Sequence, residues 1–134
     1  MNLVDSSGWL EYFAEGPNSG FFAPAIEKSG ELIVPTIVVF EVYKRVYQQR
    51  DRHAALQAIA TLRAGRIVDL TLRLAIAAAA ISSSEKLPMA DSIILATARE
   101  ENAVVWTQDA DFEHIVGVKS PRKKMINRSS RRRS

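Results

Sequence analysis

Short apolar segments alternate with longer helix-like stretches along the whole chain, and this alternation limits the possible folds more than any other feature. Four apolar segments are predicted strands, at residues 2–5, 32–34, 67–70 and 103–106, and a fifth short strand is expected at 116–119. Strands separated by helices form βαβ units, which build parallel sheets with helices on both faces. The sequence therefore predicts an α/β domain around a mostly parallel sheet of four to five strands.

Capping and breaking residues set the expected helices between these strands. We expect helices from Ser6 or Ser7 to Gly16, and at 21–28, 36–49, 51–65, 71–81 and 89–101. Pro24 would be best tolerated in the first turn of its helix. The serine run at 82–84 is expected to end the alanine-rich helix.

Four acidic residues stand where solvated surface does not easily explain them. Asp5 and Asp109 follow the first and fourth predicted strands, Glu41 interrupts an apolar run, and Asp91 shares the buried stripe of its helix. An apolar environment penalises an ionised carboxylate unless a cation, a donor network or a metal compensates it. Because ligands of parallel sheets bind outside the carboxyl ends of the strands, these four side chains could meet at one site.

Each acid also has a structural explanation. Asp5 could cap the following helix, and Glu41 could pair with a cation one turn later. Asp91 in a first helical turn would favour the helix dipole, and Asp109 could make a local turn. If the four converge, however, their mutual repulsion calls for a cation.

The available ligands narrow the identity of such a cation. The chain has no cysteine and two histidines, so carboxylate oxygens would dominate the site. Oxygen ligands favour Mg²⁺ or Mn²⁺ over Zn²⁺. A site of this kind can polarise a phosphodiester and activate water, which suggests metal-dependent phosphoryl hydrolysis.

Charge is distributed unevenly along the 134 residues. Residues 119–134 hold eight Lys or Arg and no acid, whereas the first 118 residues hold ten basic and fifteen acidic groups, a net charge of −5. We expect one domain at 1–120 and a basic, flexible tail at 121–134, which could either stay solvated or hold polyanions. Basic and aromatic residues are interleaved at 43–52, and they could form either an RNA-binding patch or the solvent-exposed face of a helix hairpin. They are Tyr43, Lys44, Arg45, Tyr47, Arg50 and Arg52.

Targeting signals are not evident. No apolar run approaches the roughly 18 residues of a membrane span. Residues 1–5 lack the basic and apolar regions of a signal peptide, so a cytoplasmic protein without a membrane partner is expected.

Several segments together resemble a known family. The segments at 4–9 (VDSSGW), 87–98 (LPMADSIILATA) and 106–112 (WTQDADF), together with Glu41, resemble the PIN domain, and specifically the VapC-type toxins of bacterial toxin–antitoxin pairs. The resemblance covers roughly residues 1–120. It implies a three-layer α/β/α sandwich and a Mg²⁺- or Mn²⁺-dependent endoribonuclease that cleaves RNA.

The resemblance also implies roles for particular residues. The acidic quartet that binds metal and performs catalysis would be Asp5, Glu41, Asp91 and Asp109. Supporting positions would be Ser6, Thr107 and, in second rank, Asp111. The family further implies a homodimer and a cognate VapB-type antitoxin that covers the active site.

The alternative is a non-catalytic α/β module that binds nucleic acid or accepts a phosphoryl group. A receiver-like domain would need an acidic pair near the first strand, but Asp5 stands alone there. A phosphatase with an aspartyl nucleophile would need a second Asp where Ser7 stands. Both absences favour the nuclease.

Overall fold

The central sheet has five strands, all parallel. The computed structural model describes residues 1–121; the basic tail expected at 121–134 therefore lies, apart from its first residue, outside the described residues. The strands run in the spatial order β3-β2-β1-β4-β5. Their bounds are β1 Asn2–Val4, β2 Leu32–Pro35, β3 Arg66–Val68, β4 Val104–Trp106 and β5 Val118–Lys119. The predicted parallel sheet is confirmed, and the fifth strand completes one edge.

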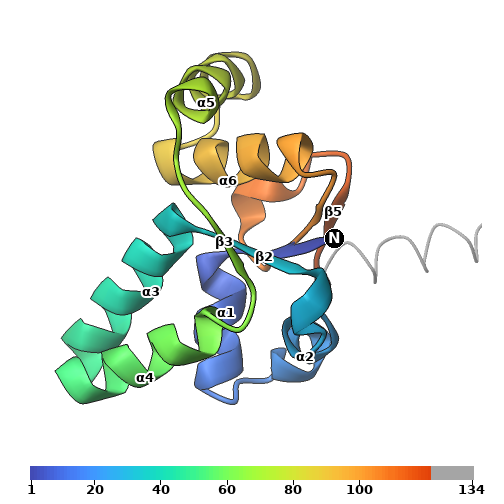
Figure 1. Cartoon of the computed structure of the whole chain (residues 1–134). Coiled ribbons are helices and arrows are strands. Elements are labelled where there is room, and N and C mark those ends of the chain that lie inside the picture. Colours follow the sequence, from blue (N-terminus) through green and yellow to red (C-terminus); the bar gives the residue numbers. More distant parts are fainter. Residues whose placement is uncertain (122–134) are drawn as a thin grey trace, which may run out of the picture.

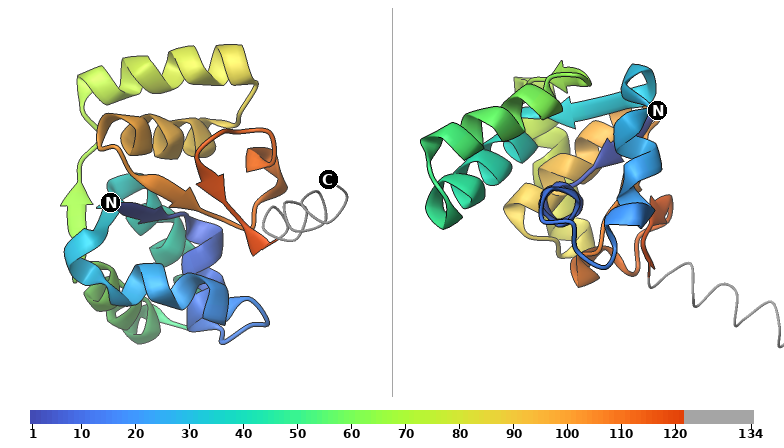
Figure 2. Two further views of the ribbon diagram at one scale, coloured as in Figure 1. Left: turned by 90° about the vertical axis from the view of Figure 1, so that its right-hand side faces the viewer. Right: turned by 90° about the horizontal axis from the view of Figure 1, so that it is seen from below.

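Helices cover both faces of this sheet. One face carries α1 Ser6–Phe13, α2 Ser19–Glu27, α3 Thr36–Gln49 and α4 Arg52–Leu62; the other carries α6 Met89–Glu100, with α5 Leu72–Glu85 stacked outside it (Figures 1 and 2). Short 3₁₀ turns, η1 Ser29–Glu31 and η2 Ala110–Phe112, complete the element order. The expected three-layer α/β/α sandwich is confirmed, and no helix within residues 1–121 is both long and apolar enough to cross a membrane.

Several helix boundaries differ from the predictions: α1 and α4 end three residues earlier than expected, and α2 and α5 differ in ways that involve a proline and a serine run. The helix α2 begins at Ser19 rather than residue 21, which places Pro24 in its interior. Proline removes the hydrogen bond to the carbonyl of Gly20, and both residues are exposed, so water can take that bond. The helix α5 continues through the serine run to Glu85 and stops at Lys86, whose φ of 56° is left-handed.

The strand order creates a switch point beside the first strand. From β1 the chain builds outward to β2 and β3, and it returns on the other side of β1 to add β4 and β5. Val4 pairs with Trp106 in register, so the residues that follow β1 and β4 leave the sheet side by side. In open α/β sheets this is where ligands bind.

Close packing beneath α1 depends on a glycine. A Cβ placed on Gly8 would lie 2.7 Å from side-chain atoms of both Phe22 and Val4, which are fully buried. Real Cβ atoms do not come that close to carbon, so Gly8 lets α1 approach β1 and α2. The position of Asp5 at the start of α1 is fixed by this packing.

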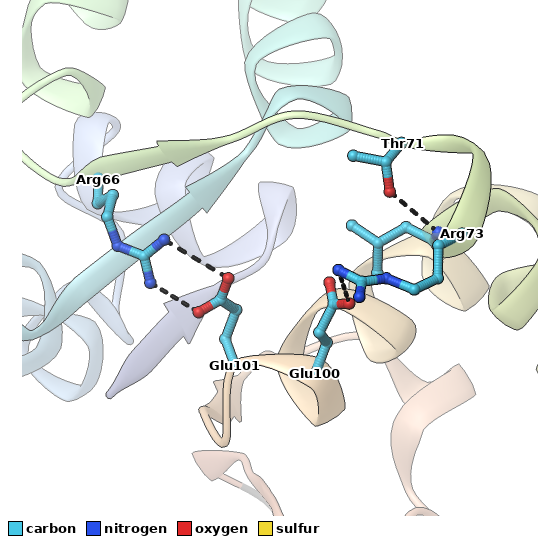
Figure 3. Close-up of polar contacts among 6 residues, drawn as sticks. Arg66, Thr71, Arg73, Glu100 and Glu101 are labelled. Atoms are coloured by element: carbon cyan, nitrogen blue, oxygen red, sulfur yellow. Dashed lines mark hydrogen bonds and ion pairs between the residues drawn. The ribbon is translucent and has the colours of Figure 1, made fainter.

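Two ion pairs tie α6 to its neighbours on the far side of the sheet from α1. Arg66 at the start of β3 binds Glu101 at 2.7 Å, and Arg73 of α5 binds Glu100 at 2.5 Å (Figure 3). Thr71 caps α5 by accepting a hydrogen bond from the Leu74 amide at 3.1 Å. Both ion pairs are largely exposed, so we expect each to contribute well under about 1 kcal/mol.

Candidate active site

Asp5 is the buried centre of the site at the switch point. It follows β1 and caps α1, and its Oδ1 accepts hydrogen bonds from the Gly8 amide at 2.9 Å and from the Ser7 hydroxyl at 2.7 Å. Its exposed fraction is 2%. The sequence left the cap open between Asp5 and the two serines that follow it, and the structure assigns it to Asp5. Asp5 itself is the cap, because it stands one residue before the first helical turn and its oxygen reaches the free amides there.

Thr107 connects Asp5 to the strand on its other side. The fully buried Thr107 hydroxyl donates a short hydrogen bond to Oδ2 of Asp5, and it accepts one from the Asp109 amide at 2.9 Å. Both oxygens of Asp5 are therefore engaged by donors. The loop after β4 is tied to the loop after β1 through this one hydroxyl.

Burial dominates the acidity of Asp5. Removal from water raises the pKa of Asp5 from 3.8 to about 6, although the hydrogen bonds from Thr107, Gly8 and Ser7 act in the opposite direction. The charge of Asp109 raises the pKa further. A carboxylate that accepts three hydrogen bonds yet keeps a raised pKa stabilises a nearby positive charge.

Three further carboxylates gather next to Asp5. Asp91 in the first turn of α6 offers a carboxylate oxygen that lies within 4.8 Å of oxygens of Asp109 and Asp111. Asp109 precedes η2 and accepts a hydrogen bond from the Asp111 amide at 2.9 Å. This 3₁₀ turn folds the loop back, so that Asp111 faces the same space as Asp109.

The crowding of these acids is visible in Asp91. Burial raises the pKa of Asp91 from 3.8 to about 7, with further contributions from the charges of Asp109, Asp111 and Asp5 and a hydrogen bond with Asp111. Four carboxylates from α1, α6 and the loop after β4 thus interact through space. Without a cation, burial and these neighbouring charges therefore favour the protonated form of Asp91.

Glu41 lies apart from this close group. It is half-buried on α3, and its Oε1 accepts a hydrogen bond of 2.9 Å from the Ser6 hydroxyl. Within the described residues, the group of carboxylates close enough to share an ion contains Asp91, Asp109 and Asp111 but neither Asp5 nor Glu41. The structure therefore places Asp111, ranked second from the sequence, nearer the centre than Glu41.

Ser7 is a site residue that sequence reasoning did not select. Besides its bond to Asp5, its hydroxyl lies 3.5 Å from that of Thr107 and accepts a hydrogen bond from the Gln108 amide at 3.3 Å. The signal was present in the Asp-Ser-Ser run. A hydroxyl two residues after a capping Asp is placed to reach that carboxylate.

The donor set fits a divalent cation with oxygen ligands. Two oxygens on opposite sides of a bound Mg²⁺ would lie about 4.2 Å apart, given bonds of about 2.1 Å. The oxygens of Asp91, Asp109 and Asp111 already lie within 4.8 Å of one another, so a small adjustment would bring them to this spacing. A cation at the same place would offset the burial and the neighbouring charges that raise the pKa of Asp91.

Solved structures share this fold across nearly the whole chain. A toxin–antitoxin complex from Klebsiella pneumoniae superposes with a TM-score of 0.78 at 22% identity, covering 90% of this chain and 98% of that one. VapC20 from Mycobacterium tuberculosis, described as a toxin that cleaves the sarcin-ricin loop, gives 0.74 at 18% identity, covering 88% and 97%. DNA-bound VapBC from Salmonella typhimurium gives 0.69 at 15%, covering 90% and 98%.

Sequence comparison agrees with the fold. No match was found among curated protein sequences. The family model described as "PIN domain" matches residues 3–118, which include Asp5, Asp91, Asp109 and both edges of the sheet. The chain belongs to the PIN domain family.

Proposed function

We propose that this protein is a metal-dependent endoribonuclease that acts as the toxin of a VapBC-type toxin–antitoxin pair. The observation that carries the proposal is the group formed by Asp91, Asp109 and Asp111, which interacts electrostatically with the buried Asp5 at the switch point of a PIN fold. A similar fold belongs to VapC20, a toxin described as cleaving the sarcin-ricin loop. The reaction class, hydrolysis of an RNA phosphodiester, follows from that likeness and from the oxygen-rich site.

In this proposal the carboxylates hold Mg²⁺ or Mn²⁺. Asp91, Asp109 and Asp111 would be direct ligands, and Asp5 would contribute directly or as the buried negative charge behind them. When bound, the cation would polarise a phosphoryl oxygen and favour the formation of a nucleophilic water. Thr107 and Ser7 would hold Asp5 in place, because each donates to one of its oxygens.

Glu41 would act on the attacking water. It lies on a separate helix, α3, and Ser6, the residue after Asp5, fixes one of its oxygens, which leaves the other to accept a proton or orient water. The sequence-based proposal made Glu41 a metal ligand as well. Its place outside the close group favours the role of water-orienting base.

A protein partner and a second copy belong to the same proposal. The structures from Klebsiella pneumoniae and Salmonella typhimurium are toxin–antitoxin complexes, which supports a VapB-type antitoxin for this chain. A homodimer is supported by apolar side chains that are largely exposed on α5 and at the start of α6, namely Leu72 at 79%, Ile76 at 64% and Met89 at 72%. An RNA substrate implies action in the cytoplasm.

An RNA cleavage assay tests the proposal. Labelled RNA would be incubated with the wild type, Asp5→Asn and Asp91→Asn in Mg²⁺, in Mn²⁺ and in EDTA. We expect cleavage by the wild type only with metal, and a loss of at least about 100-fold in both variants, because each removes a charge that holds or supports the ion. Asp51→Asn is the control, since Asp51 caps α4 through an exposed bond to the Ala54 amide that Asn preserves. Undiminished cleavage in both site variants would reject the proposal, and RNA binding without cleavage would favour the binding module instead.

A further inference from the structure

A polar hollow opens between α1 and α3 next to Glu41. Its walls include Ser6 and Leu10 from α1, and Phe40, Glu41, Lys44 and Arg45 from α3, around a volume of about 360 Å³. Such a volume lies within the range of small-molecule binding pockets. Ser6 and Glu41, which are joined by a hydrogen bond, both line the hollow, so it includes residues of the candidate active site.

Two cations and one carboxylate line the hollow, and the two cations form no ion pair within residues 1–121. Lys44 and Arg45 are both exposed, and within residues 1–121 neither forms an ion pair with an acid. The sequence had left open whether Glu41 pairs with a cation one turn later. Instead Glu41 accepts from Ser6, and both cations stay available to an anion from outside.

An exposed aromatic ring lies beside these cations. Phe40 lies on the same face of α3 and is 60% exposed, whereas phenylalanine side chains are usually buried in folded proteins. The Lys44 ammonium lies 5.8 Å from the centre of its ring, so a stacking surface and a cation stand side by side. A flat ring next to a cation is the combination that binds a base and its phosphate in single-stranded nucleic acid.

We propose that the hollow formed by Phe40, Lys44 and Arg45 is a binding subsite for single-stranded RNA, which positions a nucleotide flanking the bond that is cut. A base stacks on Phe40, while Lys44 and Arg45 hold backbone phosphates, and the strand continues past Ser6 and Glu41 toward the carboxylates. This inference rests on the proposed ribonuclease function. The other basic and aromatic residues at 43–52 do not line the hollow, which divides that segment into a subsite and an outer helix face.

The test measures binding without cleavage. Anisotropy of a fluorescent single-stranded RNA would be followed in EDTA at several salt concentrations, with the full chain and its basic tail present in every variant. Each phosphate contact contributes about 0.7 to the slope of log affinity against log salt for single strands. The double variant Lys44→Gln/Arg45→Gln should therefore lose about 1.4 from that slope. Phe40→Ala should weaken binding about 5-fold or more, and Phe40→Tyr should restore it, because tyrosine keeps the stacking face.

A matched control removes two positive charges from the other end of the strands, away from the candidate site. Lys28 and Arg63 are exposed residues that stand before β2 and β3, at the amino ends of the strands. Lys28→Gln/Arg63→Gln should leave the slope unchanged. Equal slopes for the subsite and control variants, or no RNA binding by the wild type, would overturn the inference.

Two further readouts separate this inference from the proposed function. With metal present, the subsite variants should raise KM and leave kcat near that of the wild type, unlike the carboxylate variants. If the wild type does not cleave but the slopes change as expected, the nuclease proposal fails and the hollow stands only as a binding site for single-stranded RNA. If the subsite variants bind RNA normally but lose binding of poly-glutamate, the hollow receives an acidic protein segment and the inference is wrong.

Discussion

Replacing Asp91 by asparagine should stabilise the metal-free protein at neutral and higher pH. The folded state raises the pKa of Asp91 from 3.8 to about 7. Below pH 3.8 the carboxyl is protonated in both states, and its contribution to stability is fully present. As the pH rises from 3.8 to 7, the unfolded chain ionises and the folded chain does not, so the free energy of unfolding falls. Three pKa units correspond to about 4 kcal/mol.

That figure is an upper limit, because Asp91 is only half-buried and water screens its charge. We therefore expect a gain of about 1–2 kcal/mol for Asp91→Asn over wild type at pH 8, and little difference at pH 4. Part of the gain is offset because the Asp91→Asn variant lacks the favourable interaction between the carboxylate and the dipole of α6, worth about 0.5 kcal/mol.

Urea unfolding in EDTA at pH 4, 6 and 8 measures this difference. Asp51→Asn is the control, since it also replaces an aspartate at a helix start but lies away from the cluster. The gain of Asp91→Asn between pH 4 and pH 8 should exceed that of Asp51→Asn. The reasoning is refuted if Asp91→Asn gains no stability between pH 4 and pH 8, or if Asp51→Asn gains as much.

Other predictions concern the ion, the support of Asp5 and the packing around it. Mg²⁺ or Mn²⁺ should raise the melting temperature of the wild type at pH 8 and reverse the fall in stability with pH, and a thermal melt of Asp91→Asn should show a much smaller rise. Thr107→Val should move the pKa of Asp5 above about 6, because it removes the strongest bond that lowers it; a carboxyl titration by NMR that shows no rise would contradict this. Gly8→Ala should lower the free energy of unfolding by about 1 kcal/mol, because an overpacking cost of about 1–3 kcal/mol outweighs a gain of about 1 kcal/mol in helix propensity. If urea unfolding showed a more stable variant, the packing around Gly8 would be able to relax. Glu101→Gln should cost less than about 1 kcal/mol by the same measurement, and a larger loss would mean that its ion pair with Arg66 is more than a surface contact.

The parallel sheet and the meeting of Asp5 with Asp109 could be predicted because strands that alternate with helices form parallel sheets. Apolar segments of strand length and the parallel connection rule together place the ends of β1 and β4 at one edge. Asp91 could be predicted in the same way, since it shares a buried stripe with Ile94 and Leu95.

The finer arrangement of the site could not be predicted, because it depends on how loops fold back. Asp111 joins the carboxylate group through the 3₁₀ turn η2. This turn begins with a hydrogen bond from the Asp111 amide to the Asp109 carboxylate. Glu41 lies aside because the position of α3 relative to α1 is set by tertiary packing. A helical pattern gives the face of a residue but not its distance from another element.

Direct measurement of cation binding tests the central claim that these carboxylates form one metal site. Mn²⁺ titration followed by electron paramagnetic resonance of the free ion would compare the wild type with Asp91→Asn, Asp111→Asn and Asp51→Asn. The structure predicts saturable binding by the wild type and Asp51→Asn, and affinity at least about 10-fold weaker for Asp91→Asn and Asp111→Asn. Equal Mn²⁺ affinity in all four proteins would contradict the claim, because the ion would then bind elsewhere.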